Sequence, residues 1–192
     1  LEVMASHGEE LLDWLNRYTF PAEAKFANPE YAEVCAERFL DELLRVGTTT
    51  ALVFGTVHPN SIDAFFRSCE KRNLRMISGK VMMDRNAPVG LTDSPESSYV
   101  DSKSLIESWH NKGRLRYAVT PRFAITSSPE QLNLAGLLLK EHPSVYLHTH
   151  LSENRSEVDS VRELFPGVKN YLDVYDQYDL LGQRSVFAHC IH

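Results

Sequence analysis

Apolar and polar residues alternate along the chain in two kinds of segment, short apolar runs and longer amphipathic stretches. The short runs are rich in β-branched and aromatic residues, which is typical of strands that are buried on both faces. They predict about five strands, at TTTALVFGTV (48–57), RMISGKVMM (75–83), LRYAVT (115–120), VYLHTH (145–150) and SVFAH (185–189).

Helices are predicted between these strands, because apolar residues there recur at intervals of three and four. One of them begins with Ser128, Pro129 and Gln131, which match a capping box with proline in the first turn. A polar segment from Asp84 to about Ser98 is expected to be an irregular loop. The predicted helices cover 28–47, 60–73, 99–113, 128–143 and 153–165, with a short helix at 171–178.

The first predicted helix has clear signals at both ends. Asn28 is a candidate N-cap, Pro29 suits the first helical position, and Gly47 suits the C-terminal end. The helical spacing of its apolar residues predicts a buried face formed by Tyr31, Val34, Cys35, Phe39, Leu43 and Val46.

Strands that alternate with helices, and that are apolar almost throughout, predict a parallel sheet covered by helices. Two α/β architectures fit this pattern. One is a complete doubly wound domain, and the other is the middle of a (β/α)8 barrel, which normally needs about 250 residues. Both architectures place their chemistry at the carboxyl ends of the strands.

Chemically active side chains follow three consecutive predicted strands at those ends. Arg122 follows one strand, His150 and Glu153 follow the next, and His189 ends the last. Neutral imidazoles are common zinc ligands, and a carboxylate beside a metal can move protons from a bound water. The alternative is that each histidine is a hydrogen-bonded polar residue at a strand end. We favour a metal site for His150 and His189 together.

The remaining histidines carry less weight. His148 lies two residues before His150 and therefore on the same face of the strand, one pleat deeper. We expect it to pack in the layer below the site. The others lie in or near predicted helices and loops and are interpreted as surface groups, namely His7, His58, His110 and His142, with His192 left open.

Composition narrows the class of protein. The 192 residues carry a net charge of −6 with no basic stretch, which argues against a nucleic-acid partner. The apolar run 134–139 is too short to span a bilayer, and no signal sequence opens the chain. Three widely spaced cysteines indicate reduced thiols in the cytoplasm.

Because the first residue is leucine, we expect a segment of a longer protein. Neither a P-loop, G-x-G-x-x-G nor G-x-S-x-G occurs.

Several motifs together resemble the guanine deaminases, a family of the amidohydrolase superfamily. They are LLDWLNRYTFPAEAKF, RVGTTTALVFGTVHP, GKVMMDRNAP, YAVTPRF, HTHLSEN and SVFAHCIH, and they cover essentially the whole chain. GTTT and HLSE are shared by many amidohydrolases, whereas TPRF with MDRNAP and TFPAE is more specific. The resemblance implies a (β/α)8 barrel with one zinc ion, which hydrolyses guanine to xanthine and ammonia.

The resemblance also assigns roles to individual residues. His150 and His189 match the metal-binding histidines of barrel strands five and six, and Glu153 matches the glutamate that transfers protons. Arg122 and Phe123 match the pair that holds the purine. The family takes further ligands from an H-x-H on its first strand and an aspartate on its eighth, and neither strand is expected here. The chain therefore resembles strands two to six, as a single partial barrel domain over 1–192, and alone it is expected to be inactive.

Alternatives remain open at this point. The enzyme could act on another amino- or chloro-substituted heterocycle, since residues of the missing strands can change the pocket. The chain could instead be a complete α/β domain that binds a small ligand without catalysis. The ligand types suit zinc and iron alike. The resemblance implies a small-molecule purine substrate and a homodimer, whereas the composition indicates a cytoplasmic protein with neither a nucleic-acid nor a membrane partner.

Overall fold

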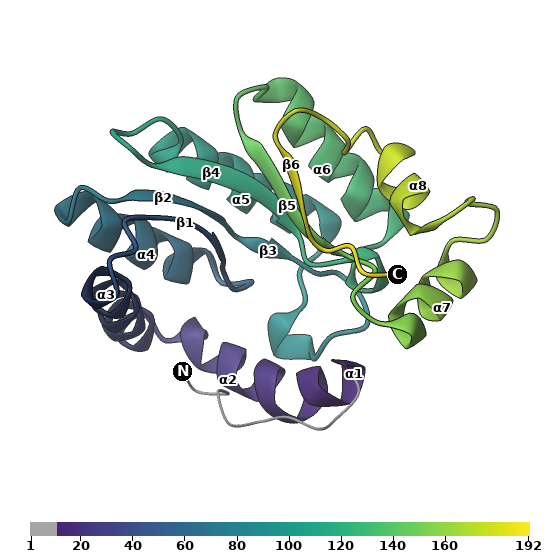
Figure 1. Ribbon diagram of the computed structural model, residues 1–192, viewed down its shortest axis with the longest axis horizontal. Coiled ribbons are helices and arrows are strands. Elements are labelled where there is room, and N and C mark those ends of the chain that lie inside the picture. The colour runs from purple at the N-terminus through teal and green to yellow at the C-terminus, as the bar shows by residue number, and fades with distance from the viewer. Residues whose placement is uncertain (1–10) are drawn as a thin grey trace.

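The computed structural model describes residues 11–192 and contains one curved, six-stranded sheet with helices packed against it (Figure 1). The strand order is β1-β2-β4-β5-β6, with β3 also paired to β4, and every pairing is parallel. The predicted parallel α/β sheet is therefore confirmed. The strands are β1 (Thr50–Phe54), β2 (Arg75–Gly79), β3 (Val81–Met82), β4 (Arg116–Pro121), β5 (Tyr146–Leu151) and β6 (Ser185–His189).

Helices connect the strands, and the first helices of the chain lie beside the carboxyl ends of the strands. Figure 1 shows α5 and α6 behind the sheet, whereas α1 and α2 run below it. The connecting helices are α3 (Pro29–Arg45), α4 (Pro59–Lys71), α5 (Pro95–Trp109), α6 (Pro129–Glu141), α7 (Arg155–Leu164) and α8 (Tyr171–Asp176). The remaining elements are α1 (Leu11–Trp14), a π-helical turn η1 (Leu15–Thr19), α2 (Phe20–Ala24), and 3-10 turns η2 (Lys25–Ala27), η3 (Val89–Leu91) and η4 (Ala124–Thr126).

The caps of α3 are those that the sequence predicts, but its buried face agrees with the prediction only in part. Asn28 accepts a hydrogen bond from the backbone N–H of Tyr31 at 3.0 Å, and Gly47 has a φ of +83° just past the helix. The helix packs against α4, where the ring of Phe39 lies 6.3 Å from that of Phe65. Of the predicted face, Tyr31, Cys35 and Leu43 are half-buried and Val34, Phe39 and Val46 are exposed, whereas the fully buried positions are Ala32, Ala36 and Leu40.

The cap of α6 forms only half of the predicted capping box. Ser128 Oγ accepts a hydrogen bond from the N–H of Gln131 at 3.1 Å, as expected. The side chain of Gln131 does not return to the cap, because the N–H of Ser128 already donates to the Asp84 carboxylate at 2.7 Å. Gln131 instead donates to Ser98 of α5 at 3.2 Å and joins two helices.

Helix α5 begins earlier than the sequence analysis predicts, and the polar loop before it is correspondingly shorter. Ser94 and Ser97 form a reciprocal capping box, and Pro95 occupies the first turn. The helix ends at Trp109 rather than near Gly113. The helix starts four residues before Tyr99 because the Ser94 cap and Pro95 begin it, whereas the helical spacing of apolar residues begins only at Tyr99.

The predicted strand 75–83 is divided in two at Lys80. The N–H of Lys80 donates to the hydroxyl of Tyr117 at 3.1 Å instead of joining the ladder. Its side chain is fully buried, and its ammonium forms an ion pair with Asp93. Burial lowers the pKa of Lys80, and the nearby Asp93 carboxylate opposes that effect. A buried charge of this kind needs its partner, so the pair holds the 84–94 loop against the sheet.

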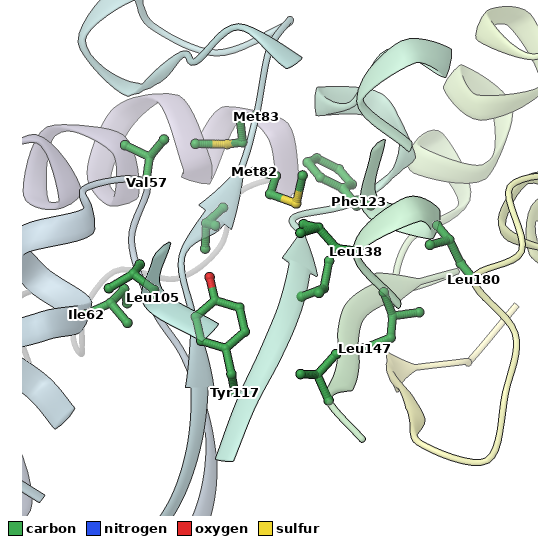
Figure 2. Close-up of a cluster of buried hydrophobic side chains, with 14 of the residues drawn as sticks. Val57, Ile62, Met82, Met83, Leu105, Tyr117, Phe123, Leu138, Leu147 and Leu180 are labelled. Carbon is green, nitrogen blue, oxygen red and sulfur yellow. The ribbon is translucent and has the colours of Figure 1, made fainter. Parts of the chain in front are cut away.

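The hydrophobic core fills the space between the sheet and its helices. Figure 2 shows Tyr117 and Leu147 of the sheet together with Ile62 of α4, Leu105 of α5 and Leu138 of α6. Burying one such aliphatic side chain stabilises the fold by about 1.5–3 kcal/mol. This packing fixes the strands from which the site residues project. No helix within residues 11–192 combines the length and apolar character needed to cross a membrane.

Candidate metal centre and substrate cavity

Three potential ligands meet where β5 and β6 end. His150 lies in β5, Glu153 in the loop that follows, and His189 is the last residue of β6. One donor atom from each residue lies within 4.8 Å of the other two. The register pairs Leu151 with His189, so the two strands end side by side. The structure thus brings together the predicted metal ligands and the predicted proton-transfer residue.

The orientation of His150 leaves one ring nitrogen free for a ligand. Its Nδ1 lies 2.8 Å from the backbone oxygen of Arg122, which can only accept a hydrogen bond. Nδ1 therefore carries the proton, and Nε2 keeps its lone pair. Burial lowers the pKa of His150 to about 4, so the ring is neutral near pH 7. A neutral imidazole with a free Nε2 is the form that binds a metal ion.

His189 adopts a strained backbone conformation at the end of β6. Its φ is +76° and that of Cys190 is +55°, in the left-handed region that non-glycine residues seldom adopt. A hydrogen bond from the N–H of Cys190 to the oxygen of Leu151 holds this turn at 2.8 Å. Strain of this kind persists where the surroundings enforce it, which often happens at functional sites. The rings of His189 and His150 are stacked, with centroids 5.4 Å apart.

Glu153 lies beside His189 in a half-buried position. Its Oε2 is 3.3 Å from Nε2 of His189. Burial raises the pKa of Glu153, with a further increase from the Glu157 carboxylate, whereas His189 and Arg122 act in the opposite direction. A carboxylate with a raised pKa is well suited to take up and release protons near neutral pH.

The loop that carries Glu153 is held by a residue that the sequence analysis missed. Glu157 is fully buried, and its Oε2 accepts hydrogen bonds from the N–H groups of Glu153 at 2.8 Å and Asn154 at 3.1 Å. Asn154 and Glu157 form the capping box of α7. The N-x-x-E spacing in the sequence was the signal that could have identified this role.

Arg122 and Phe123 lie next to the cluster. Both side chains are buried, and the Phe123 ring lies edge-on to that of His150 with centroids 6.4 Å apart. Nη1 of Arg122 contacts both carboxylate oxygens of Glu23, a second residue that the sequence analysis did not identify. Glu23 is the last residue of the TFPAE motif, but the motif gives no indication that Glu23 contacts Arg122.

A cavity of about 340 Å³ opens onto these side chains. Arg122, Phe123, His150, Glu153 and His189 line it on the side of the strand ends. Apolar side chains of α1 and η1 line it on the other side, together with Glu23 of α2. The cavity therefore combines apolar walls with a few polar groups, which is typical of small-molecule sites.

The other histidines lie away from the ligand cluster. His148 is buried against the Phe54 ring, with centroids 4.9 Å apart, in the layer where the sequence analysis expects it. His110 is not a free surface group, because its Nδ1 accepts the N–H of Tyr117 at 3.0 Å. His58 and His142 are likewise half-buried, so none of these three is the fully exposed surface group that the sequence analysis expects. His192 is exposed, and His7 lies outside the described residues.

Both the sequence and the fold of this chain are similar to those of known proteins. The sequence profile of the amidohydrolase family matches residues 2–192. The guanine deaminase of Escherichia coli is 56% identical over 191 residues, which is 100% of this chain and 44% of that protein. Its solved structure superposes with a TM-score of 0.97 over 98% of this chain and 44% of its own. A guanine deaminase from C. acetobutylicum, solved with guanine in the active site, gives a TM-score of 0.93 at 36% identity, over 96% of this chain and 44% of its own.

These matches also define how much of a relative the chain represents. It spans less than half the length of the E. coli protein, so part of the relatives' barrel has no counterpart among these residues. The sheet of this chain forms only half of a barrel, which agrees with the fraction of the relatives' length that the chain spans. Family and donor set together imply a site for a divalent cation, to which this chain contributes two imidazoles and a nearby carboxylate. The chain belongs to the amidohydrolase family.

Proposed function

We propose that this chain is the central part of an enzyme that hydrolyses guanine to xanthine and ammonia, and that it supplies strands two to six of a (β/α)8 barrel as one partial domain. The observation that carries the proposal is the convergence of His150, Glu153 and His189 in one cavity with Arg122. The names of the similar proteins, one of them solved with guanine in its active site, support this choice of substrate.

The cation is best held by His150 and His189. Their stacked rings and the free Nε2 of His150 fit an ion that accepts nitrogen ligands, and we propose zinc. When bound, the ion would lower the pKa of the attacking water and would stabilise the negative charge that develops during attack. Further ligands must come from residues outside this chain, because structural and catalytic zinc sites use at least three protein ligands.

Glu153 is the proposed proton-transfer group. It accepts one proton from the attacking water and donates it to the purine ring nitrogen, and it then accepts the remaining proton from the new hydroxyl group and donates it to the leaving amine. Water, guanine, xanthine and ammonia balance in this sequence, because each proton that Glu153 accepts is returned. The raised pKa of Glu153 supports the role, since the carboxyl group must gain and lose a proton in each cycle.

Arg122 and Phe123 are the proposed substrate-binding residues. A guanidinium is planar and presents donors in a fixed geometry, which suits the acceptor edge of a flat heterocycle. An aromatic side chain such as Phe123 suits the apolar face of the same ring. The apolar wall from α1 and η1 excludes water from the opposite side of the cavity.

The test is steady-state kinetics on the full-length protein after metal analysis. The expected result is guanine-dependent formation of xanthine and ammonia in equal amounts, with about one zinc ion per subunit. Chelation should abolish the activity, and added zinc should restore it. A metal-loaded protein that leaves guanine intact, or that prefers an amino- or chloro-triazine, would overturn the assignment.

We further propose that the protein is a cytoplasmic homodimer of purine catabolism. All three cysteines, Cys35, Cys69 and Cys190, are free, as is typical of reducing compartments. The dimer rests on the family resemblance alone. Light scattering of the purified full-length protein is the direct measurement, and a monomeric mass would contradict it.

A further inference from the structure

A buried ion pair joins two parts of the chain that are distant in sequence. Glu23 lies on α2 and Arg122 follows β4, and their side chains are only 14% and 8% exposed. Nη1 of Arg122 lies 2.7 Å from one carboxylate oxygen of Glu23 and 3.0 Å from the other. Glu23 therefore occupies a single nitrogen of the guanidinium.

The other edge of the same guanidinium is left for a ligand. Within residues 11–192, Nε and Nη2 of Arg122 form no hydrogen bond, and both Arg122 and Glu23 line the cavity. Nε and Nη2 point in the same direction from the planar group, so they can donate to two neighbouring acceptors. This is the geometry with which arginine binds O6 and N7 of guanine in nucleic acids.

Two aromatic rings lie close to the guanidinium of Arg122. Its carbon lies 5.4 Å from the ring centroid of Phe20 and 6.0 Å from that of Phe54. Phe20 and Glu23 are three residues apart on a helix and thus share a face of α2. One helix therefore presents both a ring and a carboxylate to Arg122, which restricts its rotation and its translation.

A purely stabilising role does not explain this arrangement well. Buried ion pairs are weak contributors to stability, because desolvation offsets the attraction. Glu23 also balances the charge of Arg122 in a cavity whose proposed ligand is neutral. A neutral ring can then bind without leaving an unpaired charge behind.

We propose that Glu23 is a positioning residue for substrate recognition. It holds Nη1 of Arg122 so that Nε and Nη2 donate to O6 and N7 of the purine. The carbon that bears the amino group lies on the opposite side of the six-membered ring, away from this edge. The inference rests on the proposed function, because it describes how that site recognises its substrate.

Kinetics of the full-length zinc enzyme test the inference. Glu23→Gln should raise KM for guanine roughly tenfold, as expected for a disturbed bidentate contact, with little change in kcat. In combination with Arg122→Lys it should add little, because both changes remove the same contact. Glu23→Asp keeps the charge with a shorter reach and should give an intermediate KM, which also covers the case that Glu23→Gln does not fold.

The matched control is Glu37→Gln, which removes a comparable pair with Arg72 between α3 and α4, outside the cavity. It should leave KM unchanged. Competition by 2-aminopurine, which lacks O6, gives a readout that a structural role would not affect. Its inhibition constant should change far less than KM for guanine in Glu23→Gln. Equal losses for both ligands, a loss confined to kcat, or full additivity with Arg122→Lys would overturn the inference.

A second measurement does not depend on turnover. Phenylglyoxal modifies free guanidinium groups, and peptide mass spectrometry reports the rate at Arg122. That rate should rise in Glu23→Gln and stay constant in Glu37→Gln. If the parent protein, without phenylglyoxal treatment, does not hydrolyse guanine, the proposed function is overturned. If phenylglyoxal modifies Arg122 at the same rate in Glu23→Gln as in the parent protein, the role of Glu23 is overturned.

Discussion

Glu153 lies three residues past His150, where its carboxylate reaches the cavity without being needed to hold the cation. We predict that Glu153→Gln in the full-length enzyme abolishes turnover and leaves the metal content unchanged, because the amide cannot accept and return a proton. Steady-state kinetics and elemental analysis of the same sample measure both quantities.

The control for this change is Glu163→Gln on the exposed face of α7, which should leave kcat and metal content unaltered. A Glu153→Gln enzyme with near-normal kcat would refute the proton-transfer role. Loss of metal from that variant would indicate that Glu153 is a ligand instead.

Because His148 is buried, we predict that the free energy of unfolding of the metal-free protein depends on pH. Burial lowers its pKa from 6.5 to about 4 in the folded chain. Between these values the unfolded chain binds more protons, so the free energy of unfolding should fall as the pH drops from about 6.5 to about 4. His150 contributes in the same direction. Replacing His148 with Gln should flatten the dependence in urea titrations at pH 7 and pH 5, and an unchanged slope would contradict this.

At the scale of elements, α8 anchors the site through Tyr175. The fully buried hydroxyl donates to the oxygen of His150 at 2.7 Å and accepts the N–H of Ala124 at 3.2 Å. Tyr175→Phe should lower the free energy of unfolding by about 1–3 kcal/mol, because these backbone groups lose their partner. Tyr99→Phe is the matched control, since its hydroxyl contacts Glu141 at the surface. Equal effects in denaturant titrations would refute the prediction.

Gly136 shows how packing reverses a helix propensity. Alanine inside a helix is normally favoured over glycine by up to about 1 kcal/mol. In α6, however, a Cβ at Gly136 would lie 2.2 Å from the backbone oxygen of Tyr178. Gly136→Ala should therefore lower the urea midpoint, at a cost of about 1–3 kcal/mol. Gly90→Ala meets no atom within 4 Å and should have little effect. A stabilised Gly136→Ala protein would show that the turn after α8 moves away from α6 easily.

At the scale of the whole molecule, the open edges of the sheet predict how residues 1–192 behave when they are expressed alone. In residues 11–192, β1 pairs only with β2 and β6 only with β5, so both edges of the sheet are open. Open edges promote association, and two histidines hold zinc weakly. The polypeptide should be inactive, poor in metal and prone to aggregate. Light scattering, metal analysis and an ammonia assay measure these properties, and a monodisperse sample with stoichiometric zinc would contradict the prediction.

The sequence alone determined the succession of elements and the edge of the sheet that carries the chemistry. Apolar runs and caps such as Asn28 act locally, so their outcome depends on neighbouring residues. His150 and His189 could likewise be placed together, because parallel strands share the direction of their carboxyl ends. The motifs supplied the residue roles, which stay predictions.

Only the tertiary structure decided which faces are buried and which distant side chains meet. Helix α3 buries Ala32, Ala36 and Leu40 most deeply, whereas Phe39 stays exposed although its ring lies 6.3 Å from that of Phe65 in α4. Glu23 meets Arg122 across 99 positions, a contact with no local signal in the sequence. Such pairings follow from the way the helices cross the sheet, and that geometry arises from the packing of the whole chain.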